Sequence, residues 1–476
     1  MRGALMVCGT ASDVGKSSVV AGLCRALHRQ GVRVAPFKAQ NMANNAYVTP
    51  AGHEIGRAQG VQALAAGAVP EVAMNPILLK PTGERTSQVV VMGRPLGHLD
   101  AAAYQVEKPR LLGTVLGALA DLRDRFDVVV LEGAGSPAEI NLLDGDIVNL
   151  RLAAAAGGVP AVVVGDIDRG GVFAALYGTV ALLPDDLRRL VRGFVVNKLR
   201  GDPALLADGP AELERRCGVP TLGVLPYLHG VSLDAEDSLA LPPARPAAGT
   251  DLDVAVIRFP RIANFTDLDP LTVEPAVGVR YVERPAALGR PDLVVLPGTK
   301  ATVSDLEWLR GRGLDRAVEA CGARVLGICG GYQMMGRTIV DDIESGRGEV
   351  HGLGWLDAGT VFQPTKVTRQ RRGRALNQRV SGYQIHHGRV TAANPWIQLD
   401  DAYGTEPDGA TAGGRFYGTT LHGLFEDDGF RPAFLGIDPS GASFAGAREA
   451  QLDRLADLLE AHLDLAAVYS LIKEAN

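Results

Sequence analysis

The sequence predicts an α/β protein in two parts, an N-terminal domain built on a parallel sheet and a C-terminal α/β domain. Three observations predict this fold class. Short apolar runs alternate with helical patterns along the first half, as in βαβ units around a parallel sheet. A glycine-rich loop, residues 9–17, follows the first of these runs and precedes a helical pattern. In the second half, a cysteine stands among glycines at 327–331, directly after another apolar run.

Composition and charge narrow the class of protein. At 476 residues the chain has room for about two to four domains, and 46% hydrophobic and 21% charged residues are ordinary for a soluble globular protein. A formal charge of −6 argues against a nucleic-acid partner, and no apolar run approaches the roughly 20 residues that cross a bilayer. The cysteines are odd in number and lack metal-type spacing. We therefore expect a reduced, cytoplasmic enzyme with no nucleic-acid or membrane partner; its oligomeric state is not predicted.

The apolar runs mark the expected strands. Those of the first sheet are 5–9, 32–37, 128–132, 161–165, 193–197 and 221–225, and those of the second are 253–258, 293–297 and 324–329. Most are apolar throughout, which is typical of strands that helices cover on both faces. The charge-rich stretch Arg369–Arg374 is expected to be a solvated loop, or alternatively a site that attracts an anionic substrate.

Changes in composition mark the domain boundaries. Residues 1–240 are the expected first domain, and the proline-rich segment 241–251 is the expected linker. Residues 252–445 are the expected second domain, and residues 446–476 form an amphipathic helical tail.

The first chemical motif is the loop that begins at Gly9 and reads Gly-Thr-Ala-Ser-Asp-Val-Gly-Lys-Ser. Its place between a strand and a helix is what a phosphate-binding loop requires, because backbone N–H groups at the helix N-terminus then meet anionic oxygens. Lys16 is expected to neutralise the phosphates of ATP, and the Ser17 hydroxyl to bind Mg²⁺. Lys38, which ends the second strand, is expected to contact a phosphate. The loop residues expected at the nucleotide are Gly9, Thr10, Ser12, Asp13, Gly15, Lys16 and Ser17.

The loop is one residue longer than the common pattern and resembles that of dethiobiotin synthetase and its relatives. This resemblance implies that Asn197, at the end of a later strand, recognises adenine. Related switch ATPases are the competing class, but their loops carry a second lysine where this chain has Ala11. That difference disfavours a switch or binding ATPase.

Carboxylates at strand ends are the candidate metal ligands, because open α/β sheets bind ligands at the carboxyl ends of their strands. Glu132 is expected to hold Mg²⁺, directly or through water; alternatively it is a buried carboxylate that caps a helix. Glu54, which follows the Lys38 strand, is a further candidate for metal or substrate contact. Asp166 and Asp168 either orient metal-bound water or cap the following helix.

The second motif is a strand, a tight turn and a helix around Cys329, in Arg-Val-Leu-Gly-Ile-Cys-Gly-Gly-Tyr-Gln. A nucleophile on such a turn is exposed, and the N-terminus of the helix favours the thiolate. The N–H of Gly330 and the loop that contains Gly298 are expected to form an oxyanion hole. His422 is the expected catalytic base; alternatively it is a histidine of the core.

The cysteine motif resembles that of the class I glutamine amidotransferases. Most of that class has a glutamate two residues after the histidine, where this chain has Leu424. The site is therefore expected to be a Cys–His dyad, as in the cobyric acid and cobyrinic acid subgroup. His386 and His387 are weaker candidates for the base.

Segments of both halves, in this order, make the whole chain similar to the cobyric acid synthase family of the cobalamin pathway. Besides the two motifs, the segments that carry this resemblance are 38–45, 54–59, 74–81, 132–142, 166–173 and 296–300. The resemblance implies an N-terminal synthetase domain and a C-terminal class I glutamine amidotransferase-like domain. It also implies ATP and Mg²⁺ as cofactors, with L-glutamine and a corrinoid as substrates.

The reaction that the resemblance implies is amidation of the b, d, e and g carboxylates of adenosylcobyrinic acid a,c-diamide to give adenosylcobyric acid. Ammonia would be released at the Cys–His site and would reach an acyl phosphate through a shielded passage between the domains. Gln384 stands where the family usually has a glutamate, so no charge role is expected there.

Two alternatives remain open. Cobyrinic acid a,c-diamide synthase has the same architecture and acts on different carboxylates, but the segment at 38–42 is not expected in it. A non-catalytic binding module is disfavoured because Lys16, Cys329 and His422 are all present.

Overall fold

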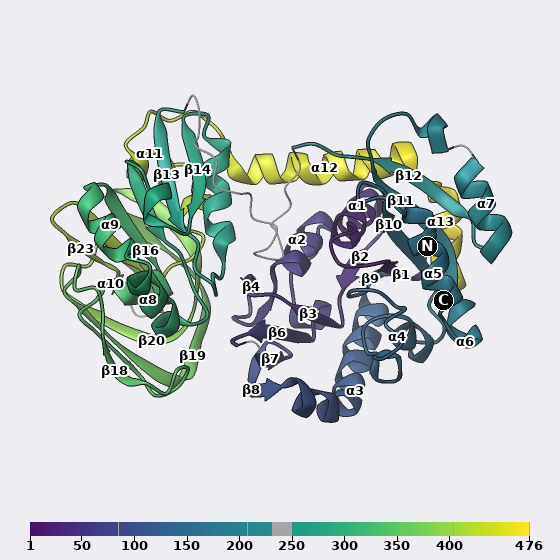
Figure 1. Cartoon of the computed structure of the whole chain (residues 1–476), viewed down its shortest axis with the longest axis horizontal. Coiled ribbons are helices and arrows are strands. Elements are labelled where there is room, and N and C mark those ends of the chain that lie inside the picture. The colour runs from purple at the N-terminus through teal and green to yellow at the C-terminus, as the bar shows by residue number, and fades with distance from the viewer. Residues whose placement is uncertain (84, 207, 231–249, 403, 476) are drawn as a thin grey trace.

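The computed structural model describes residues 1–83, 85–206, 208–230, 250–402 and 404–475. Two α/β bodies lie side by side, and the long helix α12 (Phe444–His462) runs from one to the other (Figure 1). Most of the expected linker 241–251 lies outside the described residues.

The N-terminal body is built on a parallel sheet. Within the described residues its strand order is β12-β11-β10-β1-β9-β2. The bounds are β1 Gly3–Gly9, β2 Val34–Phe37, β9 Val128–Glu132, β10 Ala161–Asp166, β11 Val191–Leu199 and β12 Thr221–Pro226. Every pairing along this order is parallel, and the central strands are buried on both faces. The predicted parallel α/β fold is confirmed.

Helices cover both faces of this sheet. Their bounds are α1 Lys16–Arg29, α2 Arg57–Ala65, α3 Ala101–Arg125, α4 Leu150–Ala155, α5 Val172–Ala181, α6 Asp185–Arg188 and α7 Asp208–Cys217. Buried leucines of α1 pack on one face together with leucines of α12. Buried residues of α3, α4 and α5 pack on the other face. Each strand end is thereby fixed in a rigid layer, which positions the loops that follow the strands.

An insertion between β2 and α3 was not expected from the sequence. It contains β3 Gln40–Met42, β4 Ala46–Val48, β5 Glu54–Gly56, β6 Ile77–Pro81, β7 Thr86–Val91 and β8 Arg94–Asp100. Strands β3, β6, β7 and β8 form one small sheet, and β4 pairs with β5. The insertion faces the C-terminal body (Figure 1).

The C-terminal body has its own central sheet, with the order β14-β13-β15-β16-β24-β23 in the described residues. The bounds are β13 Leu252–Ile257, β14 Val277–Val282, β15 Leu293–Leu296, β16 Arg324–Ile328, β23 Ala410–Ala412 and β24 Phe416–Thr419. Its helices are α8 Thr302–Gly311, α9 Leu314–Cys321, α10 Gly330–Met335 and α11 Phe430–Leu435. All pairings are parallel except that of β23 with β24.

A second sheet of this body corrects one expectation. It contains β17 Thr338–Asp341, β18 Gly348–His351, β19 Ala358–Ala375, β20 Gln378–Ala392, β21 Ile397–Asp401 and β22 Gly404–Asp408. The stretch Arg369–Arg374 lies within β19 and pairs with β20, so the expected loop is wrong. Arg371 is buried and forms a 2.9 Å ion pair with Glu406, whereas Arg372 and Arg374 are exposed. The alternation of side chains along a strand explains how one face of this basic run is buried.

The C-terminal tail returns to the N-terminal body. It consists of α12 and α13 (Leu465–Glu474). Arg25 of α1 lies 2.7 Å from Asp453 of α12, and a Cβ at Gly22 would lie 2.7 Å from Leu459. The two helices therefore touch at a glycine, where their backbones approach closely. Among the helices of the described residues, none has the length and apolar character needed to cross a membrane.

The contact at Gly22 predicts an effect on stability. Gly22→Ala should lower the free energy of unfolding by about 1–3 kcal/mol, because the added methyl group overpacks the α1–α12 contact. Gly117→Ala is the matched control, since it also lies within a helix and a Cβ there meets nothing within 4 Å. The control should be neutral or more stable by about 0.5–1 kcal/mol. Denaturant unfolding of both variants measures the difference, and equal stabilities would contradict this packing.

Candidate active sites

The phosphate loop joins β1 to α1 and is shaped by Gly15. Its φ is 101°, which favours glycine, and a Cβ there would lie 2.1 Å from the Asn197 side-chain nitrogen. That nitrogen donates a 2.9 Å hydrogen bond to the Val14 carbonyl. Asn197, expected to recognise adenine, thus braces the loop from β11.

Lys16 lies across the same loop. Its ammonium donates hydrogen bonds to the carbonyls of Ala11 at 2.8 Å and Gly135 at 3.2 Å. The side chain is buried and lines a cavity of about 1180 Å³. The expected nucleotide residues that line this cavity are Ser12, Asp13, Gly15, Lys16, Ser17 and Lys38. Gly9 and Thr10 lie at the end of β1, where the Thr10 N–H bonds to the Val164 carbonyl at 2.9 Å.

Glu132 is a buried carboxylate in the lining of this cavity. One carboxylate oxygen accepts hydrogen bonds from the Ser17 hydroxyl and the Lys38 ammonium, both at 2.9 Å. The other accepts one from Gln62 at 2.5 Å. Burial acts to raise the pKa of Glu132, but Lys38 and the hydrogen bonds outweigh it and lower the pKa below its usual value. The carboxylate is therefore ionised, and with the Ser17 oxygen it offers the hard oxygen ligands that Mg²⁺ prefers.

Glu54 does not join this pair, contrary to expectation. One of its oxygens lies 3.1 Å from the Lys80 ammonium and the other 2.7 Å from that of Lys366, in β19 of the other body. Burial opposes ionisation of Glu54, yet the two lysines hold its pKa far below the usual range. Glu54 is therefore an ion-pair residue between the two bodies, and its contact with a metal stays a prediction.

The two aspartates at the end of β10 are likewise held by cations. Asp166 pairs with Lys198 at 2.8 Å, and Asp168 pairs with Arg200 at 2.6 Å. Asp166 also accepts the backbone N–H of Asp168 at 2.9 Å, as a turn-forming carboxylate does. These contacts favour the capping alternative for Asp166.

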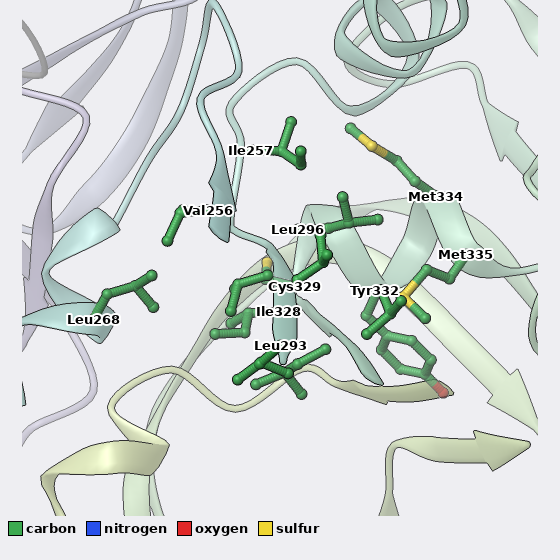
Figure 2. Close-up of a cluster of buried hydrophobic side chains, with 14 of the residues drawn as sticks. Val256, Ile257, Leu268, Leu293, Leu296, Ile328, Cys329, Tyr332, Met334 and Met335 are labelled. Carbon is green, nitrogen blue, oxygen red and sulfur yellow. The ribbon is translucent and has the colours of Figure 1, made fainter. Parts of the chain in front are cut away.

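The second site is centred on Cys329, at the turn between β16 and α10. Its φ of 50° and ψ of −107° are strained for a residue with a side chain. A Cβ at Gly331 would lie 1.9 Å from the Leu296 carbonyl oxygen, so only glycine permits this turn. Figure 2 shows Cys329 at the strand end, with Leu296 and Tyr332 among the apolar side chains around it. The core thus holds the sulfur in one place.

His422 faces the same small cavity as Cys329. Its Nδ1 lies 2.7 Å from a carboxylate oxygen of Asp267, and its ring stacks on Tyr383 with centroids 5.1 Å apart. The expected dyad is therefore wrong in one respect: a carboxylate does orient the histidine, but it comes from the 3₁₀ segment Phe265–Val273. The sequence signal is weak, because an aspartate 155 residues before His422 has no fixed spacing to it.

The environment of His422 favours its charged form. Burial opposes the charge, but Asp267 and Cys329 outweigh it and raise the pKa of His422 to about 10. An imidazolium beside a cysteine sulfur is the arrangement that stabilises a reactive thiolate. The raised pKa therefore favours a protonated His422 next to the sulfur.

His386 and His387 line the same cavity but have no such partner. Their Nδ1 atoms lie 2.7 Å from the Gly388 carbonyl and 3.0 Å from the Gln363 carbonyl. Burial lowers the pKa of His386 to about 3 and also lowers the pKa of His387, which favours the neutral form of each ring.

The remaining predicted residues of this site lie close to the sulfur. Gly298 lines the cavity of Cys329 and His422, and Gly330 is the first residue of α10. Gln384 accepts a 3.0 Å hydrogen bond from Arg369 and donates one of 2.7 Å to Thr420. An amide suits this position because it serves as acceptor and donor at once.

Comparison with known proteins places both sites in one class of enzyme. The nucleotide-binding domain of the CobQ/CobB/MinD/ParA type matches residues 5–240, and the CobB/CobQ-like glutamine amidotransferase domain matches residues 253–430. A nucleotide-binding domain joined to a glutamine amidotransferase domain is the architecture of an ATP-dependent amidoligase.

Individual relatives narrow the class. The cobyric acid synthase of Nocardia farcinica is 51% identical, over 100% of this chain and 97% of its own length. That of Mycolicibacterium vanbaalenii is 52% identical, over 99% of this chain and 97% of its own. The chain belongs to the cobyric acid synthase family, and the resemblance inferred from its motifs is confirmed.

The Asp267–His422 contact predicts a change in the pH dependence of glutamine hydrolysis. Asp267→Asn removes the largest charge that favours the imidazolium, so kcat should fall on the order of 100-fold. The raised pKa keeps His422 protonated below about pH 10. Activity is therefore lost as pH rises through this value, and in the variant the loss should begin at lower pH. Glutamate release measured against pH tests both effects.

Asp269→Asn is the matched control, because Asp269 lies on the same 3₁₀ segment and is partly exposed. It should leave the profile unchanged. An unchanged alkaline limb in Asp267→Asn would show that Asp267 does not set the charge of His422.

Proposed function

We propose that the chain amidates the b, d, e and g carboxylates of adenosylcobyrinic acid a,c-diamide, with ATP·Mg²⁺ and L-glutamine as the other substrates, in the cytoplasm. One observation carries the proposal: at two places, residues that are neighbours in the chain line different cavities. Asn264 lines the cysteine cavity and Phe265 lines the large cavity. Likewise, Lys80 lines the cysteine cavity and Pro81 lines the large cavity. A single layer of residues therefore separates the expected source of ammonia from its expected acceptor.

The cysteine site supports glutamine hydrolysis. The Cys329 thiolate would attack the side-chain carbonyl of glutamine, and N–H groups at Gly298 and Gly330 would stabilise the oxyanion. The His422 imidazolium would give its proton to the departing nitrogen, which leaves as ammonia. Neutral His422 would then take a proton from the water that cleaves the thioester, releasing glutamate and restoring the thiolate.

The large cavity supports activation of the acceptor. Lys16 and Lys38 would hold the phosphates, while Ser17 and Glu132 would hold Mg²⁺, which screens phosphate charge when bound. A corrinoid carboxylate would attack the γ-phosphorus, so that an acyl phosphate forms and ADP leaves. Ammonia would add to the acyl carbon, and phosphate would leave with the C–O electron pair and take up the proton that the nitrogen loses as the amide forms. A cavity of about 1180 Å³ exceeds the ordinary size of a single small-molecule pocket, which supports a nucleotide and a large acceptor together.

Mass spectrometry tests the choice of substrate. With ATP, Mg²⁺ and glutamine, adenosylcobyrinic acid a,c-diamide should lose about one mass unit for each carboxyl converted to an amide, and the series should end after four steps. No change in this substrate, together with two amidations of cobyrinic acid, would instead identify a cobyrinic acid a,c-diamide synthase. ATP turnover without any amidation would favour a switch ATPase.

The division of labour between the two sites predicts a second result. Cys329→Ala should abolish amidation from glutamine and leave amidation from added ammonia, because only the cysteine site is lost. Lys16→Gln should abolish amidation from both nitrogen sources and leave the glutamate release that is measured without ATP and corrinoid. Cys321→Ala is the control, since Cys321 is a half-buried cysteine of α9 and should change neither activity. If Cys329→Ala also failed with ammonia, the assignment of separate roles would be wrong.

A further inference from the structure

The turn of residues 264–267 contacts both ring nitrogens of His422. Asp267 lies 2.7 Å from Nδ1, and the Asn264 side-chain nitrogen lies 3.4 Å from Nε2. Asp267 also accepts the Gly423 N–H at 2.8 Å, next to the histidine in the chain. This turn and the stacked ring of Tyr383 therefore set the direction of the imidazole ring together.

The N-terminal body holds this turn in place. The Ala46 N–H donates to the Asn264 side-chain oxygen at 2.9 Å, and the Phe265 N–H donates to the Asn45 side-chain oxygen at 3.2 Å. Both bonds are buried, and they join residues about 220 positions apart. The two bonds are reciprocal, because each of the two chain segments supplies one backbone N–H donor and one side-chain acceptor.

The backbone of the turn needs this support. Asn264 has a φ of 52°, in the left-handed region that residues with side chains seldom adopt. Such a conformation persists when surrounding contacts fix it, and the Ala46 bond is one of these contacts. Losing the pair would free the turn, and with it Asn264 and Asp267, to move away from His422.

The segment that holds the turn also lines the nucleotide cavity. Residues 40–44 line that cavity, and Lys38 at the start of the segment bonds to Glu132. The Asn45 carbonyl accepts the N–H of Arg57 at 3.1 Å, which fixes the other end. One short segment, 38–46, therefore runs from the carboxylate of the synthetase site to the turn that orients His422.

Ala46 and Val48 also pack against Tyr383, the residue that stacks on the His422 ring. The ion pairs between the bodies end elsewhere. The Glu54–Lys366 pair reaches β19, and Arg57 pairs at 3.0 Å with Glu426, beyond His422 in the chain. These pairs hold the bodies together, whereas the Asn45 and Ala46 bonds reach the residues that contact the imidazole ring.

We propose that Asn45 is a positioning residue for glutamine hydrolysis, and that segment 38–46 transmits occupancy of the nucleotide and acceptor cavity to His422. The first part requires only the cysteine site, and the second rests on the function proposed above. Asn45 acts by accepting the Phe265 N–H, which holds Asp267 against Nδ1 of the ring. Glutamine would then be hydrolysed fastest when the acceptor is in place, and less ammonia would be lost to water.

The test compares Asn45→Ala with Asn45→Asp in the full chain. The alanine variant loses the acceptor for the Phe265 N–H, and the aspartate variant keeps an oxygen there. In Asn45→Ala, kcat for glutamate release should fall on the order of 10- to 100-fold, as expected for a misplaced catalytic group. KM for glutamine should stay within roughly twofold of the parent value, because the substitution leaves the groups that bind glutamine in place. The alkaline limb of the pH profile should move to lower pH, and Asn45→Asp should restore most of kcat.

Two further measurements distinguish a folding defect from a positioning effect. Ammonia-dependent amidation by Asn45→Ala should stay within roughly twofold of the parent chain, since it bypasses His422. ATP and corrinoid should stimulate glutamate release in the parent chain and stimulate it much less in Asn45→Ala.

Several results would overturn the proposal. Unchanged kcat in Asn45→Ala would remove the positioning role, and so would equal loss of both activities in the alanine and aspartate variants. Glutamate release that ignores ATP and corrinoid in the parent chain would remove the transmission. If the parent chain amidated no corrinoid even from ammonia, the proposed function would fail, while the effect of Asn45→Ala on glutamate release would still test positioning.

Discussion

The buried contact between Asp267 and His422 is the interaction on which the glutaminase half depends. An imidazolium is stable in this closed environment because a carboxylate lies 2.7 Å from Nδ1. The contact joins a turn after β13 to the loop after β24, so it forms only when the central sheet has brought these chain segments together. The same geometry keeps Cys329 and the protonated ring of His422 in one small cavity.

Buried carboxylates with cationic partners recur at each important junction. Glu132 lies between Lys38 and Ser17 in the synthetase half, and Glu54 joins Lys80 to Lys366 across the bodies. A buried charge is costly unless it is paired, so each carboxylate fixes the position of its partners. In Glu132 this produces an anionic centre near the phosphate loop. In Glu54 it joins the two bodies through a pair of buried lysines.

Local motifs made much of this protein predictable. A phosphate loop and a cysteine turn each lie within about a dozen consecutive residues, and their glycines meet steric demands of the local backbone, as Gly15 and Gly331 show. The strands of both central sheets were predictable because buried parallel strands are apolar throughout. The contact of Asp267 with His422 and that of Glu54 with Lys366 were missed for one reason: the members of these pairs lie 155 and 312 residues apart.

The sequence by itself determined the two α/β bodies, the phosphate loop, the reactive cysteine and the family, because these depend on periodicity, on short motifs and on composition. Only the tertiary structure decided which carboxylate orients His422, that Arg369–Arg374 is a strand, and that the tail returns to α1. It also decided that Asn45 and Asn264 hold each other's backbones. No fixed spacing in the sequence predicts contacts of this kind, because they arise from the packing of segments that come together only in the folded chain.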